Sequence, residues 1–373
     1  MDDFDFLDEE LPFHRRLWAA FTNLLGFGFF VGGLIACAFA FYIFLNPYSP
    51  YNPLPPEYSI VLPSAPSRTP PTTDLEIETA TYLPESTATS TAIPLPSLTP
   101  TITTTPSPSP TATPNLSFAV IGDFGRAGAP LAAVADLIHS WEVDFIITTG
   151  DNNYPNGEAS TIDRNIGQYF HEYIYPYQGE YGAGAEVNRF FPTMGNHDWN
   201  AESGQAYIDY FDLPGNERYY EVQFEFIHLF AVSSHVDEPD GTREFSVQAN
   251  WLQEALAEST APWKVVFFHH TPYSSGHWRG SYRLQWPFKE WGASVVIAGH
   301  DHIYERLEID GLTYFVNGVG GNGLYPITSP EPGSQVRYSS NFGAMLVNAT
   351  PTRMVFQFIN IEGEIIDTYI IEK

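Results

Sequence analysis

Five short polar motifs each follow an apolar run in this chain of 373 residues. They read Gly122-Asp123-Phe124-Gly125, Gly150-Asp151-Asn152-Asn153-Tyr154, Gly195-Asn196-His197-Asp198, His269-His270-Thr271-Pro272 and Gly299-His300-Asp301-His302. Asp, Asn, His and Tyr supply the oxygen and nitrogen atoms that bind hard or borderline metal ions, and the motifs contain no thiolate. Together they predict a site for two metal ions. Such a pair suits hydrolysis of a phosphate ester, because two ions can hold both the attacking and the leaving oxygen.

The apolar runs before the motifs predict an α/β domain. Buried strands are expected at residues 116–121, 144–149, 190–194, 265–268 and 295–298, and a helix is expected at 129–141. Motifs just beyond the carboxyl ends of such strands occupy the usual ligand-binding crevice of an α/β sheet. Four later runs, at 313–317, 344–348, 354–360 and 365–370, predict a second, antiparallel sheet packed on the first.

The amino-terminal part predicts a membrane anchor. No charged residue occurs from Leu17 to Pro56, and residues 17–45 exceed the roughly 20 apolar residues that cross a bilayer. Arg15 and Arg16 precede this segment, and the next Lys or Arg is Arg68. The positive-inside rule therefore makes residues 1–16 a cytoplasmic tail. We expect a single-pass protein of the cell membrane whose catalytic domain is extracytoplasmic.

Three alternatives compete with a retained transmembrane helix. A cleaved signal peptide has a shorter apolar region, of about 7–15 residues. Leu34-Ile35-Ala36-Cys37 resembles a bacterial lipobox that would make Cys37 a lipidated amino terminus, but residues 38–45 continue apolar past it. A buried core helix would rarely be this long. A signal peptide and a lipidated Cys37 would each place the catalytic part on the same, outer side of the membrane.

Residues 46–115 are rich in Pro, Thr and Ser and predict an extended, disordered linker, with a small β domain at 58–83 as the alternative. Cys37 is the only cysteine, so the domain at 116–373 has no disulfide and depends on its own core. The net charge of −28, with three Lys, argues against nucleic acid as a partner.

The motif series resembles, in order and spacing, that of calcineurin-like metallophosphoesterases, and most closely their purple acid phosphatase branch. The similarity covers residues 116–373. It implies an α/β fold, a metallophosphoesterase-type β-sandwich of two mixed sheets flanked by helices, preceded here by the transmembrane helix and the linker. It also implies Fe(III) paired with Fe(II), Zn or Mn, and hydrolysis of phosphomonoesters by attack of a metal-bound hydroxide.

The resemblance also assigns metal ligands. The ferric ion would be bound by Asp123, Asp151, Tyr154 and His302. The divalent ion would be bound by Asp151, Asn196, His270 and His300, with Asp151 bridging the two ions. Tyr154 distinguishes the purple branch, whose phenolate binds Fe(III). The His-x-Pro spacing selects His270 over His269, which we expect beside the ligands or in the core.

Three further residues are candidates for catalysis. His197 follows the ligand Asn196 and is the first candidate to protonate the leaving group, with Asp198 expected to orient it. His277, in the loop 274–280, is the second candidate. Two other functions stay open: a phosphodiesterase or nucleotidase with the same metal site, and a non-catalytic surface binding module. The complete ligand set argues against the binding module.

Overall fold

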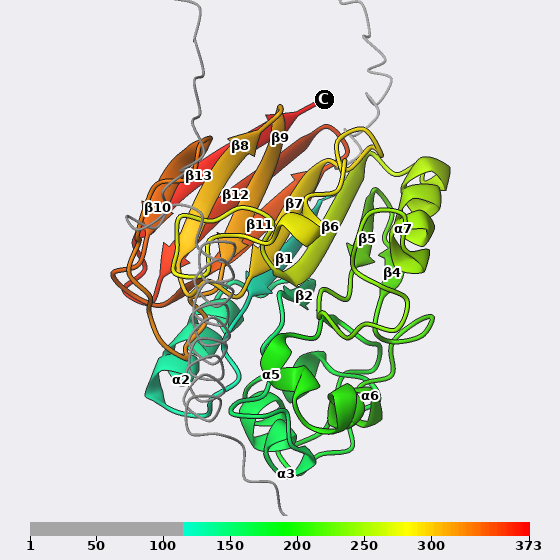
Figure 1. Cartoon of the computed structure of the whole chain (residues 1–373). Coiled ribbons are helices and arrows are strands. Elements are labelled where there is room, and N and C mark those ends of the chain that lie inside the picture. Colours follow the sequence, from blue (N-terminus) through cyan, green and yellow to red (C-terminus); the bar gives the residue numbers. More distant parts are fainter. Residues whose placement is uncertain (1–114) are drawn as a thin grey trace, which may run out of the picture. The chain divides into compact units, whose positions relative to one another are not determined.

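The computed structural model describes residues 115–373 (Figure 1). The predicted cytoplasmic tail at 1–16, the predicted transmembrane helix at 17–45 and the linker up to residue 114 lie outside the described residues. Between residues 115 and 373, no helix combines the length and apolar character needed to cross a membrane.

Two mixed sheets form the domain, as the resemblance implies. The first has the strand order β13-β12-β11-β1-β2-β3 and the second β10-β8-β9-β7-β6-β5-β4. Strands of the first sheet are β1 (Leu116–Ile121), β2 (Phe145–Thr148), β3 (Phe190–Pro192), β11 (Gly343–Thr350), β12 (Arg353–Asn360) and β13 (Ile365–Glu372). Strands of the second are β4 (Tyr220–Gln223), β5 (Ile227–Ala231), β6 (Trp263–His270), β7 (Val295–Gly299), β8 (Tyr304–Ile309), β9 (Leu312–Asn317) and β10 (Ser334–Tyr338).

The carboxy-terminal strands do not form the separate antiparallel sheet that their pattern predicts. Strand β9 lies in the second sheet and runs parallel to β7. Strands β11, β12 and β13 extend the first sheet instead, because β11 pairs antiparallel with β1 in the register Phe118↔Val347. This pairing covers the free edge of β1, which would otherwise expose unpaired backbone groups.

Side-chain alternation along β6 connects two apolar cores. Val265 and Phe267 belong to the main core, which also holds side chains of both sheets. Val266 and Phe268 belong to a second core under helix α7 (Val247–Glu258), which lies beside β5 in Figure 1. All four side chains are fully buried. Burying each contributes roughly 1.5–3 kcal/mol, so β6 is fixed on both faces up to its end at the histidine motif.

The helices lie outside the sheets. Helix α2 (Ala129–His139) has a proline in its first turn, where no backbone N–H is needed, and buries Leu131, Val134 and Ile138. Ser246 caps the amino end of helix α7, and its hydroxyl accepts a hydrogen bond from the N–H of Ala249. The remaining α-helices are short: α3 (Ala159–Ile162), α4 (Gln168–Phe170), α5 (Asn196–Trp199) and α6 (Gln205–Tyr210). Single π or 3₁₀ turns occur at η1 (Asp163–Gly167), η2 (His171–Tyr173), η3 (Glu202–Gly204) and η4 (Tyr282–Leu284).

Gly125 brings the loop after β1 against the loop after β2. Its N–H donates to the carbonyl of Asp151 at 3.1 Å, and its carbonyl accepts from the N–H of Tyr154 at 2.7 Å. A Cβ atom at Gly125 would lie 2.0 Å from the carbonyl carbon and oxygen of Asn152. Only glycine therefore lets the two loops that carry predicted metal ligands approach this closely.

We predict that Gly125→Ala lowers the free energy of unfolding by about 1–3 kcal/mol, because the added methyl group forces two backbones apart. Denaturant unfolding measures this loss. Gly128→Ala is the matched control, since its Cβ would have 3.9 Å of clearance on extended backbone. Equal stability of the two variants would contradict the close approach.

Candidate metal centre

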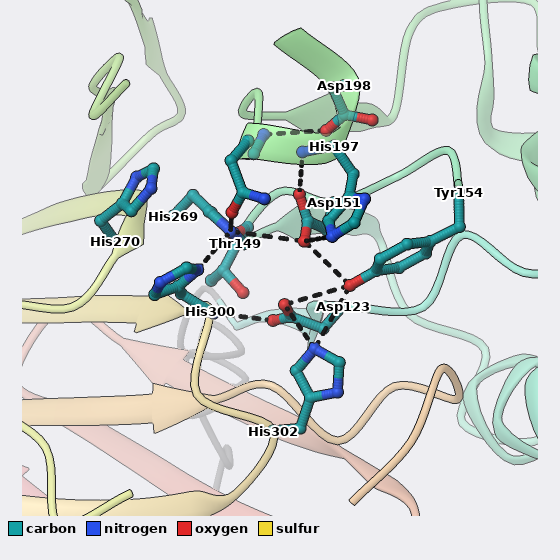
Figure 2. A network of polar contacts seen from close by, with 12 residues as sticks. Asp123, Thr149, Asp151, Tyr154, His197, Asp198, His269, His270, His300 and His302 are labelled. Atoms are coloured by element: carbon teal, nitrogen blue, oxygen red, sulfur yellow. Dashed lines mark hydrogen bonds and ion pairs between the residues drawn. The ribbon is translucent and has the colours of Figure 1, made fainter. Parts of the chain in front are cut away.

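Side chains from the ends of both sheets meet in one buried polar network (Figure 2). Asp123, beyond β1 of the first sheet, has Oδ1 at 3.3 Å from Nε2 of His302, beyond β7 of the second. Its other oxygen accepts a hydrogen bond from the backbone N–H of His300 at 2.9 Å. Asp123 therefore joins the two sheets through groups that can also bind a metal.

Tyr154 points its hydroxyl into the same group. The hydroxyl oxygen lies 2.9 Å from Asp151 Oδ2, 3.4 Å from Asp123 Oδ1 and 3.3 Å from His302 Nε2. The four residues predicted to bind the ferric ion thus converge around one point, although the assignment of an ion to them stays a prediction.

Asp151 lies between two groups of donor atoms. The first group is Asp123, Tyr154 and His302, and the second is Asn196, His269 and His300. Asp151 Oδ1 accepts from the backbone N–H of His197 at 2.9 Å, while Oδ2 lies 3.5 Å from Nε2 of His269. A Cβ atom on Gly195 would be 2.1 Å from Oδ1, so glycine is required beside the carboxylate. One carboxylate consequently faces donor atoms on both sides, as a bridging ligand must.

The second group contains a residue that sequence reasoning placed outside the ligand set. His269 is fully buried, and its Nε2 lies 3.1 Å from Asn196 Oδ1 and 3.2 Å from His300 Nδ1. Figure 2 shows His269 inside the network, linked to the backbone carbonyl of Thr149. Two adjacent histidines at 269 and 270 indicate two candidate ligands in the sequence, whereas the His-x-Pro spacing selects His270 alone.

His270, the predicted ligand, lies at the side of this network. Its Nδ1 is 2.9 Å from the hydroxyl of Ser234, and no dashed line joins it to the other labelled residues (Figure 2). Its ring centre is nevertheless 4.5 Å from that of His300. Three ring nitrogens, one each from His269, His270 and His300, lie within 4.8 Å of one another. His270 therefore remains within reach of an ion in the second group.

Backbone strain accompanies three of the predicted ligands. Asp123, Asp151 and His300 have φ angles of 55°, 54° and 70°, in the left-handed region that non-glycine residues rarely adopt. Each such residue costs about 1–3 kcal/mol unless its surroundings compensate. At these three positions the left-handed backbone accompanies side chains that take part in the polar network.

Burial sets the electrostatics of the site. It raises the pKa of Asp123 to about 6, and burial followed by the charge of Asp151 raises the pKa of Asp198 to about 8. Burial also lowers the pKa of His300 to about 4 and that of His269 well below its usual value. Burial thus favours the neutral form of the His300 and His269 imidazoles, as metal ligands require.

These residues fit a pair of cations. Polar atoms of the buried residues Asp151 and His269 and of the partly buried Asn196 face one another at 3.1–3.5 Å. Within the described residues, three buried polar atoms near the site also lack a hydrogen-bond partner, namely His302 Nδ1, Asp301 Oδ2 and Asn322 Oδ1. Cations bound at the site would be coordinated by the oxygen and nitrogen atoms that face one another there.

The three candidate catalytic residues differ in position. His197 is half-exposed, its Nδ1 lies 2.5 Å from the carbonyl of Pro155, and its Nε2 lies 4.0 Å from Asp151 Oδ2. Asp198 does not orient the His197 ring. It is buried and accepts instead from the backbone N–H groups of Gly195 and Asn152, at 2.8 and 3.0 Å, so it positions the loops.

His277 lies at the exposed rim of the site. Its ring centre is 4.8 Å from Trp278 and 5.9 Å from Tyr325, whose ring stacks on His302 at 4.0 Å. His277 therefore lies beside the rings of Trp278 and Tyr325 and outside the polar network.

Comparison with known proteins places this site in a family. Residues 116–304 match the calcineurin-like phosphoesterase family, and the chain belongs to it. It is 26% identical over 296 residues to purple acid phosphatase 17 of Arabidopsis thaliana, covering 69% of this chain and 85% of that protein. It is 21% identical over 300 residues to tartrate-resistant acid phosphatase type 5 of Oryctolagus cuniculus, covering 68% and 90%.

Solved structures share the fold. Purple acid phosphatase PPD1 from yellow lupin (Lupinus luteus) seeds has a TM-score of 0.58 at 19% identity, over 71% of this chain and 55% of that one. GAP50, described as the anchor in the inner membrane complex of Plasmodium, has a TM-score of 0.55 at 19% identity, over 69% and 89%. Together with the site, the family and its phosphatase relatives define a metal-dependent phosphoric ester hydrolase.

Tyr154 provides the test of the purple branch. A phenolate bound to Fe(III) gives a visible charge-transfer band, so we predict that iron-loaded protein is coloured and that Tyr154→Phe abolishes the band while metal content persists. Tyr325→Phe is the matched control, because its ring stacks on His302 while the network at Asp151 uses the Tyr154 hydroxyl. A colourless, fully active wild type containing only Zn or Mn would exclude the purple assignment.

Proposed function

We propose that this chain is a membrane-anchored, extracytoplasmic phosphatase that hydrolyses phosphomonoesters with two metal ions. The observation that carries the proposal is the position of Asp151. Its Oδ2 lies 2.9 Å from the Tyr154 hydroxyl and 3.5 Å from His269 Nε2, so one carboxylate serves two groups of donors. A pair of ions that share a carboxylate suits displacement at phosphorus.

The two groups differ in the ions that they suit. Asp123, Asp151, Tyr154 and His302 offer mainly oxygen, which suits Fe(III), while Asn196 and the histidines His270 and His300 suit a divalent Fe, Zn or Mn. Bound there, the ions supply Lewis acidity toward the phosphate and lower the pKa of water.

A cleft leads to the second group. It has a volume of about 240 Å³ and is lined in part by His270, Trp278 and His300. The Trp278 ring is 54% exposed and stacks on His300 with the ring centres 5.5 Å apart. On another side, the guanidinium of Arg126 lies 5.9 Å from the centre of the Tyr154 ring. Arg126 gives this acidic chain a positive charge where an anionic ester approaches.

His197 is placed to hold a proton for the leaving group. The Pro155 carbonyl can only accept, so Nδ1 of His197 carries a hydrogen, and Nε2 faces the site near Asp151. A proton on Nε2 can therefore pass to the oxygen of the departing alcohol, as general-acid catalysis requires.

We predict that His197→Ala slows turnover of alkyl phosphates by about 10²-fold while both metals stay bound. The loss should be smaller for activated aryl phosphates, whose leaving groups need little protonation. Steady-state kinetics and metal analysis measure both quantities.

His171→Ala is the matched control, because His171 is a partly exposed histidine whose Nδ1 also contacts a backbone carbonyl, that of Gly167. Equal losses for aryl and alkyl esters in His197→Ala would argue against proton donation.

A panel of phosphate monoesters and diesters distinguishes two other functions from the proposed one. A phosphodiesterase would turn over bis-aryl phosphate faster than the monoester. A non-catalytic anchor is suggested by the likeness to GAP50, described as an anchor in Plasmodium, and it would turn over neither ester. The convergence of the donor groups supports catalysis over anchoring. Faster turnover of the monoester is the result that we expect.

The membrane location rests on the uncharged segment at 17–45 with Arg15 and Arg16 before it. We predict that a broad-specificity protease added to intact cells cuts in the Pro/Thr/Ser-rich linker and releases an active soluble fragment. A cytoplasmic protein in the same cells serves as the control for lysis. Protection of the catalytic domain until lysis would contradict this topology.

A further inference from the structure

A second pocket adjoins the cleft that leads to the second group. It has a volume of about 450 Å³, and its lining includes Val236, Arg243, Phe245 and Arg283. We call it the arginine pocket. Tyr282, which lines the cleft, directly precedes Arg283 in the 3₁₀ turn η4. The guanidinium of Arg243 lies 5.8 Å from the centre of the Tyr282 ring, so this tyrosine lies at the border between the cleft and the arginine pocket.

The arginine pocket is a positive region of an acidic protein. The whole chain has 44 Asp and Glu against 16 Lys and Arg, whereas this pocket is lined by two arginines and one acidic residue, Glu244. Within residues 115–373, no carboxylate forms an ion pair with Arg243 or Arg283. A guanidinium that has no partner in the protein can bind a carboxylate or a phosphate through two parallel hydrogen bonds.

Arg283 lies close to the histidines at the end of β6. Burial and three neighbouring histidines lower the pKa of His270, and the charge of Arg283 lowers it further. Burial also lowers the pKa of His235, against the charge of Asp237, and Arg283 adds to that lowering. Because charges more than about 10 Å apart are largely screened at physiological salt, Arg283 must lie near the cleft that His270 lines.

Exposed apolar side chains border the cleft and the arginine pocket. Nine large apolar side chains are exposed in the described part of the chain, and four of them line one or the other, namely Val236, Phe245, Trp278 and Tyr282. Phe245 and Tyr282 are 80% and 71% exposed. Apolar side chains that gather beside a few charged groups are typical of a ligand-binding surface.

We propose that Arg243 and Arg283 bind a second anionic group of the substrate, while the cleft holds the phosphate that is hydrolysed. The inference rests on the proposed phosphatase function and narrows its substrate class. The substrate is a phosphomonoester with a carboxylate or a second phosphate at its far end and an apolar middle part that contacts Tyr282. A volume of about 450 Å³ suits a small molecule, because small-molecule pockets have roughly 300–1,000 Å³.

The test uses the full chain, purified in detergent and loaded with iron and zinc. Its probes are N-acetyl-phosphotyrosine, which has a free carboxylate, and the corresponding amide, which has none. Both contain the same aryl phosphate, so a difference in kcat/KM reports the carboxylate alone. An alkanediol bisphosphate and the matching alkyl phosphate form a second pair, which shows whether a phosphate serves as the far group.

Two variants each remove one guanidinium, Arg243→Gln and Arg283→Gln. Arg353→Gln is the matched control, because it removes the same charge from an exposed arginine that lines neither pocket. Arg353 lies on β12, where its Nε is 3.3 Å from Oε1 of Glu372. The control therefore separates a local contact with the substrate from the effect of net charge.

We expect the wild type to prefer the anionic member of at least one pair by about 10-fold in kcat/KM, mainly through a lower KM, because hydrogen bonds between charged groups add to binding. Each arginine variant should reduce this preference to about 3-fold or less, and the Arg353 control should keep it. Equal kcat/KM within both pairs for the wild type, or an unchanged preference in both arginine variants, would overturn the anion subsite and leave the phosphatase function intact. Absence of hydrolysis of every probe by the metal-loaded wild type would overturn both.

Discussion

The carboxylate of Asp151 is the constraint around which the site is arranged. It is 2% exposed and is approached on one side by Tyr154 and on the other by His269. A buried negative charge in this position is unfavourable unless cations compensate it. The surrounding features serve this single group: glycine at position 195 makes room for it, and the N–H of His197 binds its second oxygen.

The site joins the two sheets of the domain. Asp123, Asp151 and Asn196 follow strands of the first sheet. In the second sheet, His269 and His270 end strand β6, and His300 and His302 follow β7. Ions bound among them would therefore connect the halves of the sandwich as well as catalyse hydrolysis. Because ligands that bind only the folded state stabilise it, removal of the metals should lower the stability of the whole domain.

Much of the fold and site could be predicted from the sequence. The apolar run before Asp123 predicted the bounds of β1 correctly. Six predicted ligands meet in one network, because parallel strands bring their carboxyl ends to one edge of a sheet. The sheet that receives β11 was mispredicted, since local pattern does not encode the partner of a strand. The irregular pairing of β6 with β7 near His269, and the left-handed backbone of Asp123 and His300, arise from tertiary packing and leave no periodic signal.

Metal content and turnover, measured in one preparation before and after chelation, test the central claim most directly. The account predicts two ions per chain, loss of phosphomonoester hydrolysis when a chelator removes them, and recovery when iron with a divalent metal is returned. Full turnover by protein that holds no metal would contradict it.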